Sequence, residues 1–260
     1  MQSESNLTRR ALLRLLAGGA ALAAAGPVRA GETRITLLIR QAQRFPTVAK
    51  RIDFVSRAFV GTRYRGYTLI GGPRRPEQFV MRDDGFDCVT YCETVLAAAL
   101  VREPDEFAAT LRQIRYRGGS VSWRERNHYF TEWGVNNTAA GLCAPVSLPG
   151  SETIVRTLTE MRALGPRPIS FDAIPRNSLL ANKALLATGD IIAFVSRRTD
   201  LDVFHVGFVV VDRDGGLWLR HAAKSKGRVV EQPLARFLKQ HRVHAVALWR
   251  PRERLDDVIV

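Results

Sequence analysis

The chain has 260 residues, of which 46% are hydrophobic and 25% are charged, and this ordinary globular composition excludes a collagenous, low-complexity or wholly disordered protein. The 39 lysines and arginines outnumber the 25 aspartates and glutamates, and the formal net charge of +14 favours polyanionic partners such as nucleic acid, anionic lipid or wall polymer. Three cysteines are too few for a scaffold built on disulfides, and an odd number leaves at least one thiol unpaired within the chain.

The first 30 residues have the features of an export signal. Thr8 to Arg14 contains an arginine pair of the twin-arginine type, an apolar stretch runs from Leu15 to Gly26, and Val28-Arg29-Ala30 offers small residues for cleavage. The alternative is a helical anchor, but 12 apolar residues span only about 18 Å of helix, less than the roughly 30 Å of a bilayer core. We therefore predict a signal peptide over 1–30 and a single domain over 31–260, periplasmic or secreted, without stable membrane insertion after signal removal.

The basic charge outside this signal is dispersed. The signal carries four arginines and one glutamate, so residues 31–260 keep +11 of the total. Their basic residues occur in every segment, with no run of five or more like charges. This pattern favours a solvated basic surface over a nucleic-acid partner.

The first half of the mature chain is predicted to be mainly helical. Helical spacing of apolar residues runs from Arg34 to Phe59, and a loop rich in Gly and Pro follows to Phe79. Cys88 to Val101 is apolar enough for a buried helix that ends at Glu103-Pro104, and a further helix covers Asp105 to Ile114. Arg115 to Gly141 is both polar and aromatic, which is typical of a partly exposed binding wall.

The second half changes its periodicity. Glu152 to Leu164 is predicted as a helix stopped by Gly165-Pro166. Short β-rich runs follow at 190–196, 203–212, 217–222 and 244–249, and Arg213-Asp214-Gly215-Gly216 is a hairpin signal between the second and third. Helices followed by antiparallel strands predict an α+β fold.

Cys88 stands at the start of the buried helix. Asp87 before it can cap the helix, and Gly85 permits a tight entry. The positive end of a helix favours the thiolate, so we expect a lowered cysteine pKa and a nucleophile at neutral pH. The alternative is that Cys88 is a small buried apolar residue, as free cysteines usually are.

Two histidines can meet on the predicted hairpin. If the turn pairs Val211 with Leu217, His221 lies opposite Gly207 and diagonal to His205 on the same face. A slip of one residue would put them on opposite faces. In this register one imidazole can take the thiol proton while the other orients it.

These segments together resemble a known family. FDCVTYCET from Phe86, GDIIAF from Gly189, FHVGFV around His205 and RHAAK around His221 resemble the NlpC-type papain-like cysteine peptidases of bacterial cell walls. RERNHYFTEW, from Arg124 to Trp133, resembles the N-acetylmuramoyl-L-alanine amidase-like branch. The resemblance implies a papain-like core, with the nucleophile helix packed on an antiparallel sheet and extra N-terminal helices.

The resemblance also implies roles for individual residues. Cys88 would be the nucleophile, His205 the general base and later acid, and His221 the residue that orients His205. Tyr64, or its neighbour Tyr67, would help to bind the oxyanion beside the backbone N–H of the nucleophile. The branch cuts the amide between N-acetylmuramic acid, or its anhydro form, and L-Ala in peptidoglycan or muropeptides, without a metal or other cofactor.

The segment from Arg124 to Trp133 has two interpretations. As a substrate site, Arg124 and Arg126 would pair with carboxylates, Asn127 and His128 would bond amides, and Tyr129 and Trp133 would stack on sugar rings. Alternatively, it is an amphipathic surface segment whose aromatic residues anchor it to the core. The resemblance favours the first.

Three further points limit the chemistry. Cys92 is either a core residue or a disulfide partner for Cys143, whereas Cys88 lies too far from it along a helix for a disulfide. His241 and His244 are predicted to be surface residues, and no HExxH, CxxC pair or clustered carboxylates indicate a zinc site. Two other functions stay open: a stem-peptide endopeptidase with the same triad, and a non-catalytic wall-binding protein on the same fold.

Overall fold

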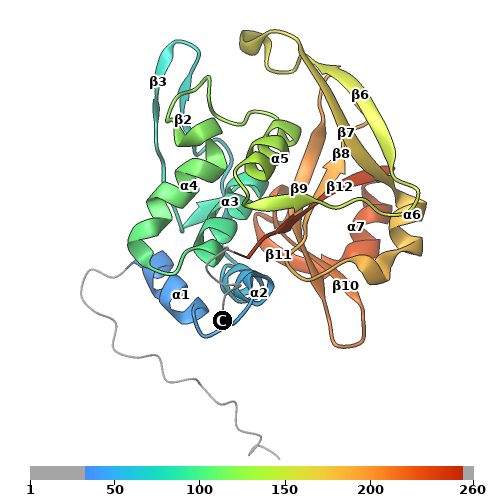
Figure 1. The fold of residues 1–260 in the computed structure, drawn as a ribbon, viewed down its shortest axis with the longest axis horizontal. Coiled ribbons are helices and arrows are strands. Elements are labelled where there is room, and N and C mark those ends of the chain that lie inside the picture. Colours follow the sequence, from blue (N-terminus) through green and yellow to red (C-terminus); the bar gives the residue numbers. More distant parts are fainter. Residues whose placement is uncertain (1–32, 254–260) are drawn as a thin grey trace, which may run out of the picture. The chain divides into compact units, whose positions relative to one another are not determined.

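The computed structural model describes residues 33–253, and the predicted signal therefore lies outside the described part of the chain. The described residues form seven α-helices and twelve β-strands, which is a mixed α+β fold (Figure 1). The helices are α1 (Arg34–Ala42), α2 (Val48–Ala58), α3 (Cys88–Leu100), α4 (Phe107–Arg115), α5 (Phe130–Ala139), α6 (Arg176–Ala181) and α7 (Leu234–Gln240). The strands are β1 (Arg63–Tyr64), β2 (Ile70–Gly72), β3 (Arg75–Gln78), β4 (Gly85–Phe86), β5 (Cys143–Pro145), β6 (Glu152–Leu158), β7 (Arg167–Pro175), β8 (Ile191–Val195), β9 (Val203–Val211), β10 (Leu217–Ala223), β11 (Arg228–Pro233) and β12 (Ala245–Pro251).

Ten of these strands form one sheet, in the order β4-β1-β11-β10-β9-β8-β12-β7-β6, with β5 added beside β12. The short strands β1 and β4 pair in parallel, and the other pairs are antiparallel. The four predicted strands in the last third are confirmed as β8, β9, β10 and β12. The central part of the sheet is therefore built from consecutive antiparallel strands, as the hairpin signals indicate.

The two faces of the sheet carry separate cores. Val206 and Phe208 of β9 pack in the core that contains α3, while Val209 of β9 and Leu219 of β10 pack with α7. In Figure 1, helices α1 to α5 gather on one side of the sheet and α7 lies on the other. Alternate residues of β9 therefore point to different helices, because side chains alternate along a strand.

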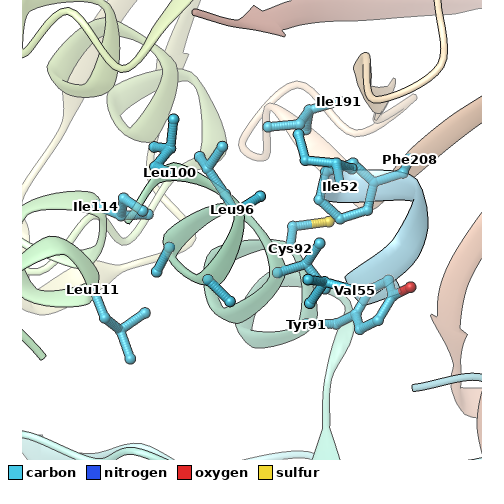
Figure 2. Packing of buried hydrophobic residues seen from close by; sticks show 14 of the residues in the cluster. Ile52, Val55, Tyr91, Cys92, Leu96, Leu100, Leu111, Ile114, Ile191 and Phe208 are labelled. Atoms are coloured by element: carbon cyan, nitrogen blue, oxygen red, sulfur yellow. The ribbon is translucent and has the colours of Figure 1, made fainter. Parts of the chain in front are cut away.

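Helix α3 is buried on all sides, and its sequence accounts for this. The run from Cys88 to Leu100 carries few polar side chains, and a helix that is apolar all round packs inside a protein. Figure 2 shows Cys92, Leu96 and Leu100 of this helix surrounded by side chains from α2, α4 and the sheet. The helix starts at Cys88, as predicted, so its first residue is held by the largest core of the domain.

Two predicted helices differ from the structure. The stretch from Arg34 to Phe59 is two helices, because Pro46 lacks an amide donor and restricts the residue before it; Thr47 then caps α2. The predicted helix over 152–164 is wrong. Residues Glu152–Leu158 form strand β6, which pairs with β7 over seven residues. The β-branched residues of ETIVRTL favour a strand, and β7, the next strand along the chain, supplies the pairing partner that an apolar pattern alone does not reveal.

A buried arginine fixes the register of β10 against β11. Arg220 is fully buried, and its guanidinium donates to Glu231, to Asp53 and to the hydroxyl of Ser56. Arg220 also stands directly opposite Glu231 in the ladder. A slip in this pairing would leave a buried charge without its partners, which costs several kcal/mol. The pair therefore fixes the neighbouring positions of His221 and Gln232.

Candidate active site

Cys88 is held at the first position of α3 by a capping box. The Asp87 carboxylate accepts from the backbone N–H of Thr90 at 2.8 Å, and the Thr90 hydroxyl accepts from the backbone N–H of Asp87 at 3.0 Å. These two bonds satisfy amides that a helix start leaves free, and the N–H groups of Cys88 and Val89 remain close to the sulfur. The thiol is thereby presented at a rigid helix end.

The protonation state of this thiol differs from the expectation. Burial, and then the neighbouring Asp87 carboxylate, raise the pKa of Cys88 to about 12, although nearby backbone N–H groups lower it in part. The helix end alone would favour the thiolate, but here desolvation outweighs it. Cys88 is therefore a neutral thiol in the free protein near neutral pH, and it needs a base before it can act as a nucleophile.

The hairpin register that places the two histidines is confirmed. Leu217 pairs with Val211, and the ladder continues to Arg220 with Phe208. Nε2 of His205 lies 2.6 Å from Nδ1 of His221, and the two ring centroids are 4.7 Å apart. The two imidazoles are therefore joined by a short hydrogen bond on the face of the sheet that packs with α7.

A third side chain extends this chain of hydrogen bonds. Gln232 of β11 pairs with Leu219 of β10. Leu219 lies two residues before His221, so Gln232 is a diagonal neighbour of His221 on the same face of the sheet. Its side-chain nitrogen lies 3.0 Å from Nε2 of His221. The sequence analysis did not single out Gln232, because its relation to His221 depends on the pairing of β10 with β11. The run RVVEQP, with two adjacent valines, was the available signal for that strand.

Both imidazoles are neutral in the free protein. Burial, with smaller contributions from His221 and His241, lowers the pKa of His205 to about 3. Burial, and then His241, lower the pKa of His221 to about 4. At neutral pH the site therefore holds an uncharged thiol and two uncharged rings, which is the starting state for proton transfer from sulfur to nitrogen.

Cys88 reaches the sheet where β9 and β10 separate. The backbone N–H and C=O of Val209 form hydrogen bonds toward the β8 side of the strand. Because backbone groups of successive strand residues point to alternate sides, the N–H of Val206, three residues earlier, points toward β10. The last pair of the β9 and β10 ladder is Phe208 with Arg220, and beyond it the Val206 N–H interacts with the Cys88 sulfur. The thiol thus lies beside the residue that follows His205. Within residues 33–253 no hydrogen bond joins the thiol to the His205 ring, so the two groups do not form a preformed pair.

Of the two candidate tyrosines, Tyr64 is the one near the thiol. Tyr64 pairs in parallel with Phe86, two residues before Cys88. Burial, and then the charges of Cys88 and Asp87, raise the pKa of Tyr64 to about 12, so its hydroxyl keeps its proton. Tyr67 is fully exposed and has a positive φ of 59°. The hydroxyl of Tyr64 is therefore the side-chain donor available beside Cys88.

Three of the predicted substrate-binding residues line one pocket. Arg124, Arg126 and Asn127 border a cavity of about 380 Å³, together with Arg117 and Arg167. Arg126 is engaged by Glu77 at 3.0 Å, and the Asn127 amide donates to the Ile114 carbonyl and accepts from Asn136. Within the described residues the guanidinium of Arg124 has no ion-pair partner. Among the basic groups of this pocket it is therefore the one most available to bind a substrate carboxylate.

The other three residues of that segment have structural contacts. Tyr129 and Trp133 are 1% exposed, and Trp133 stacks on Phe130 with centroids 4.8 Å apart. His128 bonds the Trp123 carbonyl at 2.7 Å. The expectation that Tyr129 and Trp133 offer their faces to sugar rings is therefore wrong, because α5 turns these rings into the core. The rest of 115–141 is partly exposed, as expected, and supplies much of the lining of the pocket that contains Arg124.

Cys88, Cys92 and Cys143 are all free, and the last two are buried in the core. Three or more His, Cys, Asp or Glu side chains do not cluster as metal ligands anywhere in residues 33–253. His241 is exposed, as predicted, and also lines a pocket with His205 and His221, whereas His244 is half-buried. No helix in the described part of the chain is long and apolar enough to cross a membrane.

Comparison with known proteins identifies the family of this chain and proteins of similar fold. The family model described as N-acetylmuramoyl-L-alanine amidase-like matches residues 54–245. An N-acetylmuramoyl-L-alanine amidase from Bacteroides uniformis is 26% identical, with a TM-score of 0.69 over 79% of this chain and 99% of that chain. A protein from Legionella pneumophila has a TM-score of 0.73 at 22% identity, over 84% of this chain and 93% of that one.

A protein from Bacteroides fragilis, described as a candidate xylanase, is 26% identical, with a TM-score of 0.63 over 75% of this chain and 99% of that chain. No curated protein matches. The fold and the family together define an amidase-like hydrolase of peptidoglycan. The chain belongs to the N-acetylmuramoyl-L-alanine amidase-like family.

Proposed function

We propose that this protein is a cysteine amidase that hydrolyses the amide between N-acetylmuramic acid, or its anhydro form, and L-Ala in peptidoglycan fragments. The observations that carry the proposal are the short hydrogen bond between His205 and His221 and a helix-start cysteine whose sulfur meets the backbone N–H of Val206, the residue after His205. A nucleophile, a base and a group that orients the base are the parts that such a reaction needs. Glycoside hydrolysis instead uses two carboxyl groups that flank the bond, and the Cys88 site does not present such a pair.

The proposed reaction begins with a proton transfer. The Cys88 thiol gives its proton to Nδ1 of His205, and the sulfur attacks the carbonyl carbon of the scissile amide. The oxygen of the tetrahedral intermediate accepts from the backbone N–H of Cys88 and from the Tyr64 hydroxyl. His205 then protonates the leaving amine nitrogen, the C–N bond breaks, and a thioester remains. Water, deprotonated by His205, hydrolyses the thioester and restores the thiol.

Nδ1 of His205 is assigned to the thiol because Nε2 already faces His221. For Nδ1 to accept a proton, Nε2 must carry one and donate it to Nδ1 of His221. His221 then carries its own proton on Nε2 and needs an acceptor there. The Gln232 amide supplies one when its oxygen, rather than its nitrogen, faces His221; the two ends of this amide are nearly identical in shape. We therefore assign Gln232 as the residue that sets the tautomers of both rings.

The proposal extends to the type of core, the export signal, the cellular location and the substrate site. A papain-like NlpC-type core is supported by a nucleophile helix, α3, that packs on an antiparallel sheet. Residues 1–30 act as a twin-arginine type signal, and 31–260 form the single catalytic domain of a periplasmic or secreted enzyme. The substrate site includes Arg124, which lines the cavity of about 380 Å³ beside α5.

Defined muropeptides test this function directly. The protein without residues 1–30 is incubated with a disaccharide that carries a stem peptide, and the products are weighed by mass spectrometry. Free disaccharide plus an intact peptide is the expected result. A shortened stem left on the sugar would instead establish an endopeptidase, which the same triad can also perform. Binding of the muropeptide without any cleavage would establish a wall-binding protein.

A further inference from the structure

A second cavity opens directly onto the two histidines. It measures about 360 Å³, and His205, His221 and Gln232 form part of its lining. We call it the histidine pocket. The Arg124 pocket shares none of these residues, so the two cavities are separate. A group bound in the histidine pocket would therefore lie against the hydrogen-bond chain that the proposed function assigns to proton transfer.

The charged side chains that line the histidine pocket are all basic. Lys224 and Lys226 line it from a single turn of 3-10 helix, Lys224–Lys226. Gly227 follows this turn with a φ of 65°, a left-handed conformation that glycine adopts readily because it has no side chain. Neither lysine has an ion-pair partner within residues 33–253, and no aspartate or glutamate belongs to the lining. Two uncompensated ammonium groups beside a concave surface attract an anionic ligand.

The remaining wall is aromatic. Phe204 is 41% exposed, and Phe237 and His241 of the α7 region lie 4.3 Å apart between ring centroids. Such a surface accommodates the apolar part of a ligand while the lysines bind its charge. The lining therefore matches a small molecule or peptide that combines carbon chains with carboxylates.

The reaction decides which part of the substrate lies here. The imidazole that protonates the leaving nitrogen must face the leaving group, because a proton is transferred only within hydrogen-bonding distance. For hydrolysis of a muramoyl-peptide amide the leaving group is the amine of the peptide, and a peptide always carries at least a terminal carboxylate. Given the proposed function, we infer that the histidine pocket receives the peptide part of the substrate and that Lys224 and Lys226 bind its carboxylates.

Two substrates test this inference by turnover. They are muramoyl peptides that are identical except that the peptide carboxylates are free in one and are carboxamides in the other. In the variant Lys224→Met/Lys226→Met, we expect KM for the free acid to rise about fivefold, since each exposed ion pair contributes modestly. We expect kcat, and both constants for the carboxamide, to change less than twofold. The matched control is Lys183→Met/Lys239→Met, which removes two exposed lysines that do not line the pocket.

A binding measurement separates this inference from the proposed function. Product peptide, as the free acid and as the carboxamide, is titrated calorimetrically into the Cys88→Ala protein and into the same protein with both lysine changes. Tighter binding of the free acid that disappears with the two lysines supports the histidine pocket, even if the wild-type protein cleaves a different bond. Equal binding of the two peptides, or equal losses in the control variant, overturns it while leaving the amidase intact.

Discussion

The side-chain nitrogen of Gln232 lies 3.0 Å from Nε2 of His221, so both nitrogens of this imidazole have a hydrogen-bonding partner. Gln232→Met keeps the length of the side chain and removes both amide groups. We expect kcat to fall about tenfold, because a hydrogen bond between uncharged groups contributes about 0.5 to 1.5 kcal/mol and about 1.4 kcal/mol corresponds to a tenfold change. Initial rates at saturating muropeptide measure this.

The conservative change at the same position separates orientation from packing. Gln232→Glu can only accept at neutral pH, so it favours the tautomers that leave Nδ1 of His205 free. We expect it to retain most of the activity and to move the acidic limb of the pH profile upward. The control is Gln240→Met, which lies in the same pocket without a bond to either ring. An unchanged rate in Gln232→Met would contradict the assignment.

Substitution of Cys88 should affect turnover, whereas substitution of Cys92 or Cys143 should affect stability. Cys88→Ala is expected to lower turnover at least about a thousandfold, because it removes the nucleophile of one catalytic unit. Cys92→Ala and Cys143→Ala should keep their activity and lose about 1 to 2 kcal/mol of unfolding free energy, since both thiols are buried in the core. Steady-state rates and urea denaturation test the three variants in parallel. Substantial turnover in Cys88→Ala would exclude this mechanism.

The two histidines should have unequal effects. The turnover of His205→Ala is expected to fall as far as that of Cys88→Ala, because the substitution removes the base. His221→Ala should be slow but active, since His205 keeps its place and loses only the partner of Nε2. The double variant should be no worse than His205→Ala, as members of one unit are not additive. Wild-type activity in His221→Ala would mean that another residue orients the base.

The pH profile follows from a neutral thiol and neutral rings. The pKa of His205 is lowered to about 3, that of His221 to about 4, and that of Cys88 is raised to about 12. The base is therefore unprotonated above about pH 5, and kcat/KM should stay flat from there to about pH 10 and fall below pH 4. A resting thiolate and imidazolium pair would instead lose activity near the pKa of the imidazolium, on the alkaline side of neutral.

The same pKa values predict how stability depends on pH. An unfolded histidine binds a proton near pH 6.5, whereas His205 and His221 resist protonation in the folded state. The unfolded state therefore binds more protons as the pH falls below 6.5, and stability decreases toward pH 4. Urea midpoints at pH 7 and pH 5 measure this. His205→Phe should show a smaller decrease than the wild type.

Chelation and thiol reagents distinguish the cysteine mechanism from a zinc amidase. EDTA is expected to leave the rate unchanged, and iodoacetamide should abolish it, slowly at neutral pH because the thiol is protonated. Mild oxidation to the sulfenic stage should be reversed by a reductant. Activity that is lost with EDTA and returns with zinc would refute the mechanism.

Local patterns in the sequence predicted the parts of the site that depend on neighbouring residues. The helix start at Cys88 follows from an aspartate cap before a long apolar run, and the register of β9 and β10 follows from the length of their turn. His205 and His221 share a face for that reason. Sequence alone therefore determined the helix start at Cys88, the histidine pair and the α+β class, because each depends on short-range geometry and on the alternation of side chains.

Strand pairing and packing that no local pattern revealed decided the rest. Glu152–Leu158 became a strand because β7 pairs with it, and Tyr129 and Trp133 became core residues because α5 packs on the sheet. Gln232 reaches His221 only through the pairing of β10 with β11. The pKa of Cys88 rises where a helix end alone would lower it, since desolvation depends on everything packed around the thiol. Burial and strand pairing are properties of the assembled chain, and for this reason only the tertiary structure could decide them.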